Sequence, residues 1–248
     1  MGSDGALSRR AWYRGVTRIG IFDYGAGNLH SLVKAIEGGE RTVSVETDIR
    51  SSLKADILIL PGVGAFGAAV AAMGGAQGYV RSALADGKPC LGVCLGMQML
   101  FDASEETPGA DAGIGLIPGQ VTRLLTTKVP HMGWNEIEWV SRGQREAGSG
   151  KRETGNGKRE AGNGKPETSV VDQAFRQSEM QSAYFANAYV CWPEDKSTVL
   201  AWTTHQNARF ASVVRTANTV GVQFHPEKSS VSGRNFVNGV IDELLQCS

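Results

Sequence analysis

Residues 88–101 constrain the fold of this chain more than any other segment. An apolar run leads into Cys94, an apolar helical pattern follows it, and Gly92 and Gly96 stand two positions before and after it. This spacing is typical of a strand-turn-helix elbow, in which a nucleophile sits on a tight turn that needs small neighbours. The first amides of the helix can then stabilise a thiolate and hold an oxyanion. A buried structural cysteine between a strand and a helix is the alternative.

Bulk composition is ordinary for a globular chain. The 248 residues allow one large α/β domain or two small ones. Lys+Arg and Asp+Glu both count 25, so net charge gives no argument for a nucleic-acid or membrane partner, and no run approaches the roughly 18 apolar residues of a membrane span. The four cysteines form no CxxC pair, which favours reduced thiols and a cytoplasmic location; they are Cys90, Cys94, Cys191 and Cys247. Cys90 is expected to lie in the core.

The first strand is expected at residues 18–23, after a flexible extension over residues 1–17. A glycine-rich turn follows, and residues 29, 32, 33 and 36 are apolar at the spacing of a helix face. The turn resembles a dinucleotide fingerprint, but His30 occupies the third glycine position, so that pattern fails. Further strands are expected over 42–46 and 56–60, and alanine-rich helices over 65–86.

Gly62 and Gly64 flank Val63 just after the strand at 56–60. Two glycines free the backbone to aim an N–H into a site at the carboxyl end of a strand, where open α/β sheets place their ligands. An ordinary strand-to-helix turn is the alternative.

Residues 18–248 are expected to form one domain, which is interrupted once in the second half of the chain. Residues 120–125 and 136–140 suggest antiparallel strands, with an exposed aromatic and polar turn over 129–135. Residues 143–170 divide into four glycine-rich heptads without an apolar seam, so a disordered insertion at about 142–170 is expected rather than a coiled coil. Strands near 183–190, 199–203, 210–215 and 219–224 follow, and an amphipathic helix ends the chain.

The strand at 219–224 leads into His225, Pro226 and Glu227. In an extended segment residues i and i+2 share a side, so the Glu227 carboxylate can reach one imidazole nitrogen while the other faces a nucleophile. Pro226 biases His225 toward extended geometry. Cys94, His225 and Glu227 can therefore supply a nucleophile, a base and an orienting carboxylate. A structural hydrogen-bonding histidine is the alternative.

Three motifs together resemble the class I glutamine amidotransferase family: Pro-Gly-Val-Gly at 61–64, Gly-Val-Cys-Leu-Gly-Met-Gln at 92–98 and Gln-Phe-His-Pro-Glu at 223–227. Three further stretches, at 23–28, 130–135 and 225–229, are similar to one branch of that family, the glutaminase subunits of imidazole glycerol phosphate synthases. The resemblance implies a flavodoxin-like three-layer α/β sandwich with a central mixed, mostly parallel sheet flanked by helices.

The resemblance also implies an activity and a partner. Glutamine would be hydrolysed to glutamate and ammonia, and the ammonia would pass to a (β/α)8-barrel cyclase subunit in a heterodimer that makes imidazole glycerol phosphate and AICAR for histidine biosynthesis. No cofactor and no metal are implied. The implied site comprises the triad Cys94, His225 and Glu227; oxyanion-hole amides of Val63 and Leu95; glutamine-binding Gly62, Gly64, Gln98 and Glu106; and docking residues Asn28, Trp134 and Lys228.

Asn187 and Ala188 depart from the family pattern, which usually has a Val-His-Ser or similar triplet here. The departure places side-chain contacts to glutamine at these positions in question, while backbone contacts could survive. Two alternative functions stay open at this point. One is a glutaminase subunit of another amidotransferase, and the other is a catalytically silent regulatory homologue.

Overall fold

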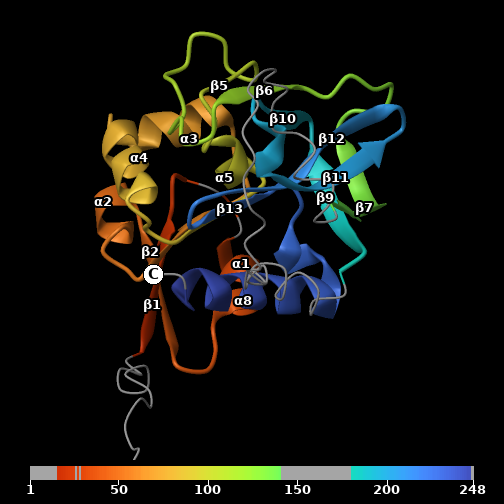
Figure 1. Ribbon diagram of the computed structural model, residues 1–248. Coiled ribbons are helices and arrows are strands. Elements are labelled where there is room, and N and C mark those ends of the chain that lie inside the picture. The colour runs from red at the N-terminus through yellow and green to blue at the C-terminus, as the bar shows by residue number, and fades with distance from the viewer. Residues whose placement is uncertain (1–15, 26, 28, 141–179, 247–248) are drawn as a thin grey trace, which may run out of the picture.

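The computed structural model describes residues 16–25, 27, 29–140 and 180–246, and its centre is a mixed eight-stranded sheet (Figure 1). The first five strands in spatial order are parallel, and the last three complete the sheet in antiparallel fashion. In that order they are β2 (Arg41–Glu46), β1 (Thr17–Phe22), β3 (Ile57–Leu60), β4 (Cys90–Val93), β13 (Thr219–Val222), β12 (Ala208–Thr216), β11 (Val199–His205) and β8 (Glu138–Trp139). The expected α/β fold is confirmed. The predicted insertion and most of the predicted N-terminal extension lie outside the described residues.

Helices cover both faces of the sheet (Figure 1). One face carries α1 (Leu29–Ile36) and α8 (Ser230–Gln246), and the other carries α2 (Ile49–Ser52), α3 (Phe66–Ala72) and α4 (Gln77–Ala85). Successive residues of β3 enter opposite cores: Ile57 and Ile59 pack with α1 and α8, whereas Leu58 and Leu60 pack with α3 and α4. Burial on both faces explains why these parallel strands are continuous apolar runs.

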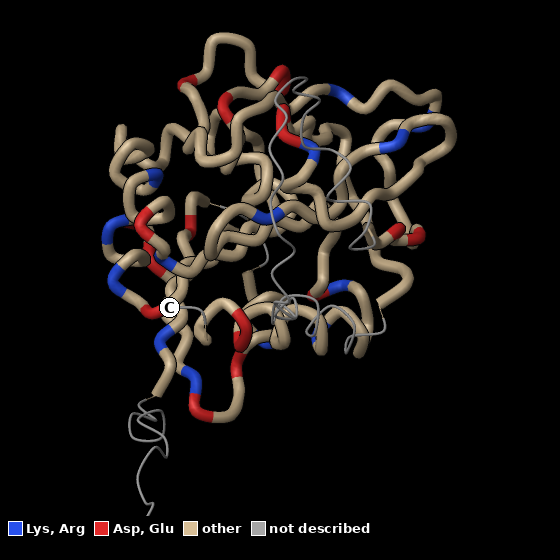
Figure 2. Tube along the Cα trace, in the orientation of Figure 1, with Lys and Arg blue, Asp and Glu red and all other residues tan. Residues whose placement is uncertain are grey.

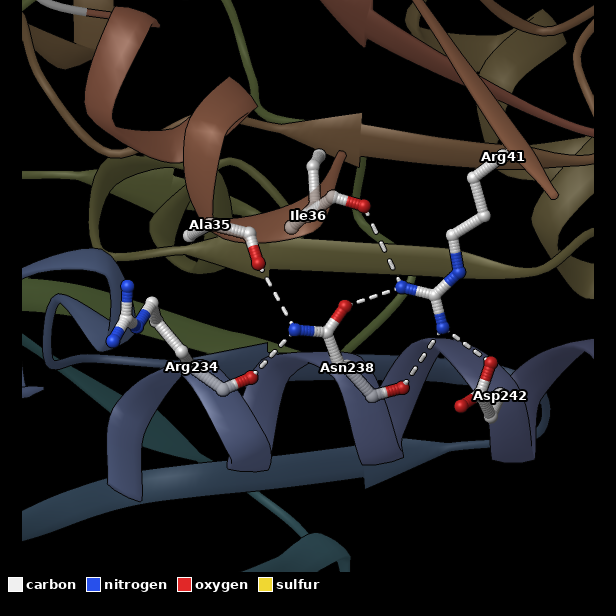
Figure 3. Close-up of polar contacts among 6 residues, drawn as sticks. All are labelled: Ala35, Ile36, Arg41, Arg234, Asn238 and Asp242. Carbon is white, nitrogen blue, oxygen red and sulfur yellow. Dashed lines mark hydrogen bonds and ion pairs between the residues drawn. The ribbon is translucent and has the colours of Figure 1, made fainter. Parts of the chain in front are cut away.

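A polar network joins α8 to the end of α1 and to β2 (Figure 3). Asn238 Nδ2 donates to the carbonyl of Ala35 at 2.9 Å and to that of Arg234 at 2.8 Å. The Arg41 guanidinium donates to Asn238 Oδ1 and pairs with Asp242. The last carbonyls of a helix have no partner within it, so α8 caps α1 from the side.

Two smaller sheets lie beside the main one and correct the predicted strands. The first contains β7 (His131–Glu136) and β9 (Ser182–Asn187), and the second contains β10 (Tyr189–Pro193), β6 (Gly119–Arg123) and β5 (Ala103–Ser104). The turn expected over 129–135 is wrong, because residues 131–136 pair with β9 as a strand. The single strand expected near 183–190 is two strands separated at Ala188, because the chain changes sheet there. Residues 120–125 and 136–140 form strands in different sheets rather than with each other.

Charged residues of both signs are interspersed along the described chain (Figure 2). Within that part of the chain, no helix has the length and apolar character required to cross a membrane. The remaining short helices, α5 (Leu95–Gln98), η2 (Lys196–Thr198) and η3 (Pro226–Lys228), lie between strands or lead into α8. Of these, α5 and η3 position the candidate site.

Candidate active site

Cys94 occupies the sharp turn between β4 and α5, with φ 46° and ψ −101°. Such a conformation is sparsely populated for an L-residue and costs roughly 1–3 kcal/mol, so its surroundings must enforce it. A Cβ at Gly92 would lie 2.7 Å from the carbonyl carbon of Gly96, and one at Gly96 would lie 2.0 Å from the carbonyl oxygen of Leu60. Close packing therefore requires both glycines, as the elbow pattern predicts.

Strand β13 brings His225 beside Cys94. β4 and β13 are parallel neighbours whose last residues, Val93 and Val222, are in register, and the Cys94 N–H donates to the carbonyl of Val222 at 2.6 Å. His225 Nδ1 lies 2.8 Å from Glu227 Oε1. The structure therefore brings together the three side chains that the sequence nominates as a triad.

The imidazole of His225 is 2% exposed. Burial by itself lowers its pKa, but the neighbouring Cys94 sulfur and the Glu227 carboxylate raise that pKa more, to about 10. At neutral pH the ring therefore carries a proton, held between a sulfur and a carboxylate. A protonated imidazole in this place can donate to a leaving group.

Gln223, a residue without a predicted role, also contacts the sulfur. Its Nε2 lies 3.5 Å from Cys94 Sγ, and its side chain is fully buried. The signal was present in the Gln-Phe-His motif, because residues 223 and 225 lie on the same side of an extended chain.

A cavity of about 200 Å³ opens over Cys94. Its walls contain every residue that the sequence nominates for glutamine binding, together with residues 186–189, where the sequence departs from the family triplet. The lining residues are Gly62, Val63, Gly64, Cys94, Leu95, Gln98, Glu106, Ala186, Asn187, Ala188, Tyr189, His225 and Lys228. Pieces of the chain from residue 62 to residue 228 thus converge on the thiol.

Two polar side chains in the cavity wall are also bound to the fold. Gln98 is buried, and its Nε2 donates to the carbonyl of Tyr189 at 3.2 Å. Glu106 Oε2 accepts from the N–H of Phe66 at 2.7 Å, which caps the first turn of α3. Both side chains are therefore held in place at the cavity before any ligand arrives.

Tyr24, a residue without a predicted role in the site, holds the segment 61–64. The Tyr24 hydroxyl donates to the carbonyl of Pro61 at 2.5 Å, and a Cβ at Gly64 would lie 3.2 Å from its ring. Burial raises the pKa of Tyr24, whereas the Val63 N–H, which approaches the hydroxyl, lowers it. Val63, whose N–H is expected to bind the oxyanion, thus lines the cavity, but in this structure that N–H approaches the Tyr24 hydroxyl.

Residues expected at a docking face lie near the mouth of this cavity or on β7. Trp134 and Met132 lie two residues apart on the same side of β7, and they are 54% and 65% exposed. Lys228 is exposed and lines the cavity. Asn28 lies outside the described residues. Among the residues that the structure does describe, no group of three or more His, Cys, Asp and Glu side chains is arranged to hold a metal ion.

Comparison with known proteins identifies the class to which this site belongs. The family model described as "Glutamine amidotransferase class-I" matches residues 21–239. A solved structure of PurLQS from Thermotoga maritima matches with a TM-score of 0.61 at 16% identity, covering 93% of this chain and 98% of the other, which is a likeness of fold. The chain belongs to the class I glutamine amidotransferase family.

Sequence relatives narrow the position within the family. The imidazole glycerol phosphate synthase subunit HisH of Pyrococcus furiosus is 36% identical over 223 residues, covering 88% of this chain and 97% of that protein. The subunit of the same name from Halobacterium salinarum is 37% identical over 234 residues, covering 90% and 94%. The resemblance in the motifs is thereby confirmed, and the chain is a HisH-like class I glutamine amidotransferase.

Proposed function

We propose that this chain is the glutaminase subunit of an imidazole glycerol phosphate synthase and hydrolyses glutamine to glutamate and ammonia. The observation that carries the proposal is the placement of Cys94 on a strained elbow, beside a buried His225–Glu227 pair and at the floor of a cavity. The family match and the HisH relatives support the same activity.

The proposed reaction has two halves. Cys94 Sγ attacks the carbon of the glutamine side-chain amide, and the imidazolium of His225 gives its proton to the departing ammonia, which leaves a γ-glutamyl thioester. His225 then takes a proton from water, the water oxygen attacks the thioester carbon, and the carbon–sulfur bond breaks to release glutamate and the Cys94 thiolate beside the reprotonated imidazole. Glu227 holds Nδ1 throughout, which keeps the other ring nitrogen directed at the reacting atoms.

The oxyanion of each tetrahedral intermediate needs hydrogen-bond donors. Leu95 begins α5, so its N–H is not used by the bonds of that helix and is directed at the elbow. The Val63 N–H is the second proposed donor. It approaches the Tyr24 hydroxyl in this structure and would have to turn toward the cavity to serve the oxyanion.

The proposed partner is a cyclase subunit of (β/α)8-barrel type, with which the chain forms a heterodimer and a complete lyase. Ammonia reacts as a nucleophile only when unprotonated, which favours a dry path between the two subunits. The exposed apolar side chains of Met132 and Trp134 suit such an interface, as does the position of Lys228 at the cavity mouth. A cytoplasmic heterodimer without a cofactor is the form that we propose.

Glutamine turnover measured with and without the cyclase subunit and its ligand tests the proposal. We expect hydrolysis that rises strongly in the complex and is lost in Cys94→Ala, while the complex still uses supplied ammonia. Recovery of a different synthase with the tagged chain, without the barrel cyclase, would favour another amidotransferase. Full glutamine-dependent activity of Cys94→Ala would favour a silent homologue.

A further inference from the structure

Two buried polar atoms that have no hydrogen-bond partner among the described residues belong to cross-strand neighbours of the pair β7–β9. His131 and Asn187 are directly opposite in the register, and these two residues are 3% and 4% exposed. His131 Nδ1 and Asn187 Oδ1 each lack a hydrogen-bond partner among the described residues. Side chains of directly opposite residues stand on the same face, with Cβ atoms about 4.5–5.5 Å apart. At this spacing a rotation of the Asn187 side-chain amide can bring the two atoms within hydrogen-bond distance.

The hydrogen bonds of Asn135 assign the proton on His131. Asn135 Oδ1 accepts from the N–H of Glu136 at 2.8 Å, and Nδ2 donates to the carbonyl of Thr204 at 3.0 Å, so the orientation of this amide is fixed. The same Nδ2 lies 3.3 Å from His131 Nε2, which must therefore accept. In a neutral ring the proton then sits on Nδ1. Burial, and secondarily His205, lowers the pKa of His131 to about 4, so the ring is neutral at pH 7.

The ring of His131 is fixed by stacking. Its centroid lies 4.8 Å from that of Phe185 and 4.0 Å from that of His205, with both pairs nearly parallel. The carboxamide of Asn187 is the adaptable member of the pair, because its terminal torsion is soft. The His131 N–H is a donor and the Asn187 amide oxygen is an acceptor. Burying both without partners costs more free energy than an ordinary hydrogen bond contributes.

Asn187 connects this pair to the glutamine cavity. It lines the cavity, and its Nδ2 donates to the carbonyl of Tyr189 at 3.1 Å, which also accepts from Gln98. This carbonyl belongs to Tyr189, which begins β10 and pairs with Arg123 of β6, and the Ala188 carbonyl accepts from the Leu124 N–H at 2.9 Å. The two side-chain bonds therefore add to backbone pairing at the point where the chain changes sheet.

We propose that His131 is a positioning residue for the glutamine cavity: in the working enzyme its Nδ1–H donates to Asn187 Oδ1 and fixes the wall at residues 187–189. The inference rests on the proposed glutaminase function. It assigns a role to Asn187, one of the two positions at which the chain departs from the family triplet, and to a histidine outside the triad.

A matched pair of substitutions tests the role. His131→Asn places an amide nitrogen near the position of Nδ1 and keeps the donor, whereas His131→Gln keeps only a group near Nε2. In the complex we expect His131→Gln to raise the KM for glutamine about tenfold with little change in kcat, and His131→Asn to raise it threefold or less. In an Asn187→Ala background the two substitutions should no longer differ. Equal KM values for the two single variants, or effects that simply add to Asn187→Ala, would overturn the proposal.

A spectroscopic measurement on the wild-type chain does not depend on the stability of the variants. Two-bond ¹H–¹⁵N correlation of His131 at pH 7 should show the neutral ring with its proton on Nδ1, and a proton on Nε2 would overturn the proposal. Wild-type turnover is measured first, because absence of glutamine hydrolysis in the complex would refute the proposed function. Normal turnover with unchanged variants would refute only the positioning role.

Discussion

Gly96→Ala tests the elbow most directly. A Cβ at this position would lie 2.0 Å from the carbonyl oxygen of Leu60 and 2.6 Å from its carbonyl carbon. Real Cβ contacts are essentially never shorter than 3.0 Å, so α5 and β3 would have to separate by about 1 Å. The obstacle is backbone in a central strand, which cannot turn aside as a flexible side chain can.

The magnitude follows from that geometry. Overpacking of a core typically costs 1–3 kcal/mol, and a backbone obstacle places Gly96→Ala at about 3 kcal/mol of unfolding free energy. A displacement of about 1 Å at a catalytic group can cost on the order of 100-fold in rate, so kcat/KM for glutamine should fall by about that factor. Urea denaturation and glutaminase assays in the complex measure the two effects.

Gly78→Ala is the matched control. Gly78 lies on the exposed side of α4, its φ is not in the positive region, and nothing lies within 4 Å of a Cβ built there. The same substitution should therefore stabilise the chain by roughly 0.5–1 kcal/mol through helix propensity and leave turnover unchanged. If Gly96→Ala behaved like Gly78→Ala in both assays, the close approach of the elbow to β3 would be refuted.

Three other perturbations probe the rest of the fold. Asn238→Ala should lower the unfolding free energy by about 1–2 kcal/mol, because two hydrogen bonds to helix carbonyls are lost; exposed Asn235→Ala in the same helix is the control, and equal denaturation midpoints would contradict the capping role. Between about pH 6.5 and 4 the unfolded chain binds a proton at His131 that the folded chain does not, so stability should fall as pH falls, by about 2 kcal/mol; a pH series in which His131→Gln has the same slope would rule this out. Deleting residues 143–168 should leave soluble protein and glutaminase activity nearly intact, and insoluble protein would show that the segment is structural.

Local chemistry explains which parts of the site could be predicted from the sequence. The elbow is encoded within five residues, because glycine at 92 and 96 is required by contacts that the turn itself creates. The pairing of His225 with Glu227 is equally local, since alternation along an extended chain places residues 225 and 227 on one side. The convergence of the two motifs needed one further fact, that the strands before them both end at the same edge of a parallel sheet.

Pairing between distant segments explains what the sequence did not show. Residues 129–135 have the composition of a turn, with Gly133, Trp134 and Asn135 in succession, and only partnership with β9 makes residues 131–136 a strand. His131 is the one fully buried residue of that strand, so alternation within the segment gives little apolar signal. Its partner lies more than 50 residues further along the chain.

The cross-strand pairing of Asn187 with His131 changes the interpretation of Asn187. Where the family motif usually has a histidine and a serine, this chain has Asn187 and Ala188. From the motif alone, this difference places side-chain contacts to glutamine in question. Opposite His131, however, the asparagine amide has a donor bonded to Tyr189 and an acceptor that has no hydrogen-bond partner among the described residues. A substitution that weakens a motif can therefore be consistent with the fold when the cross-strand neighbour is complementary, and the paired His131 variants test whether this chain uses that complementarity to hold its cavity wall.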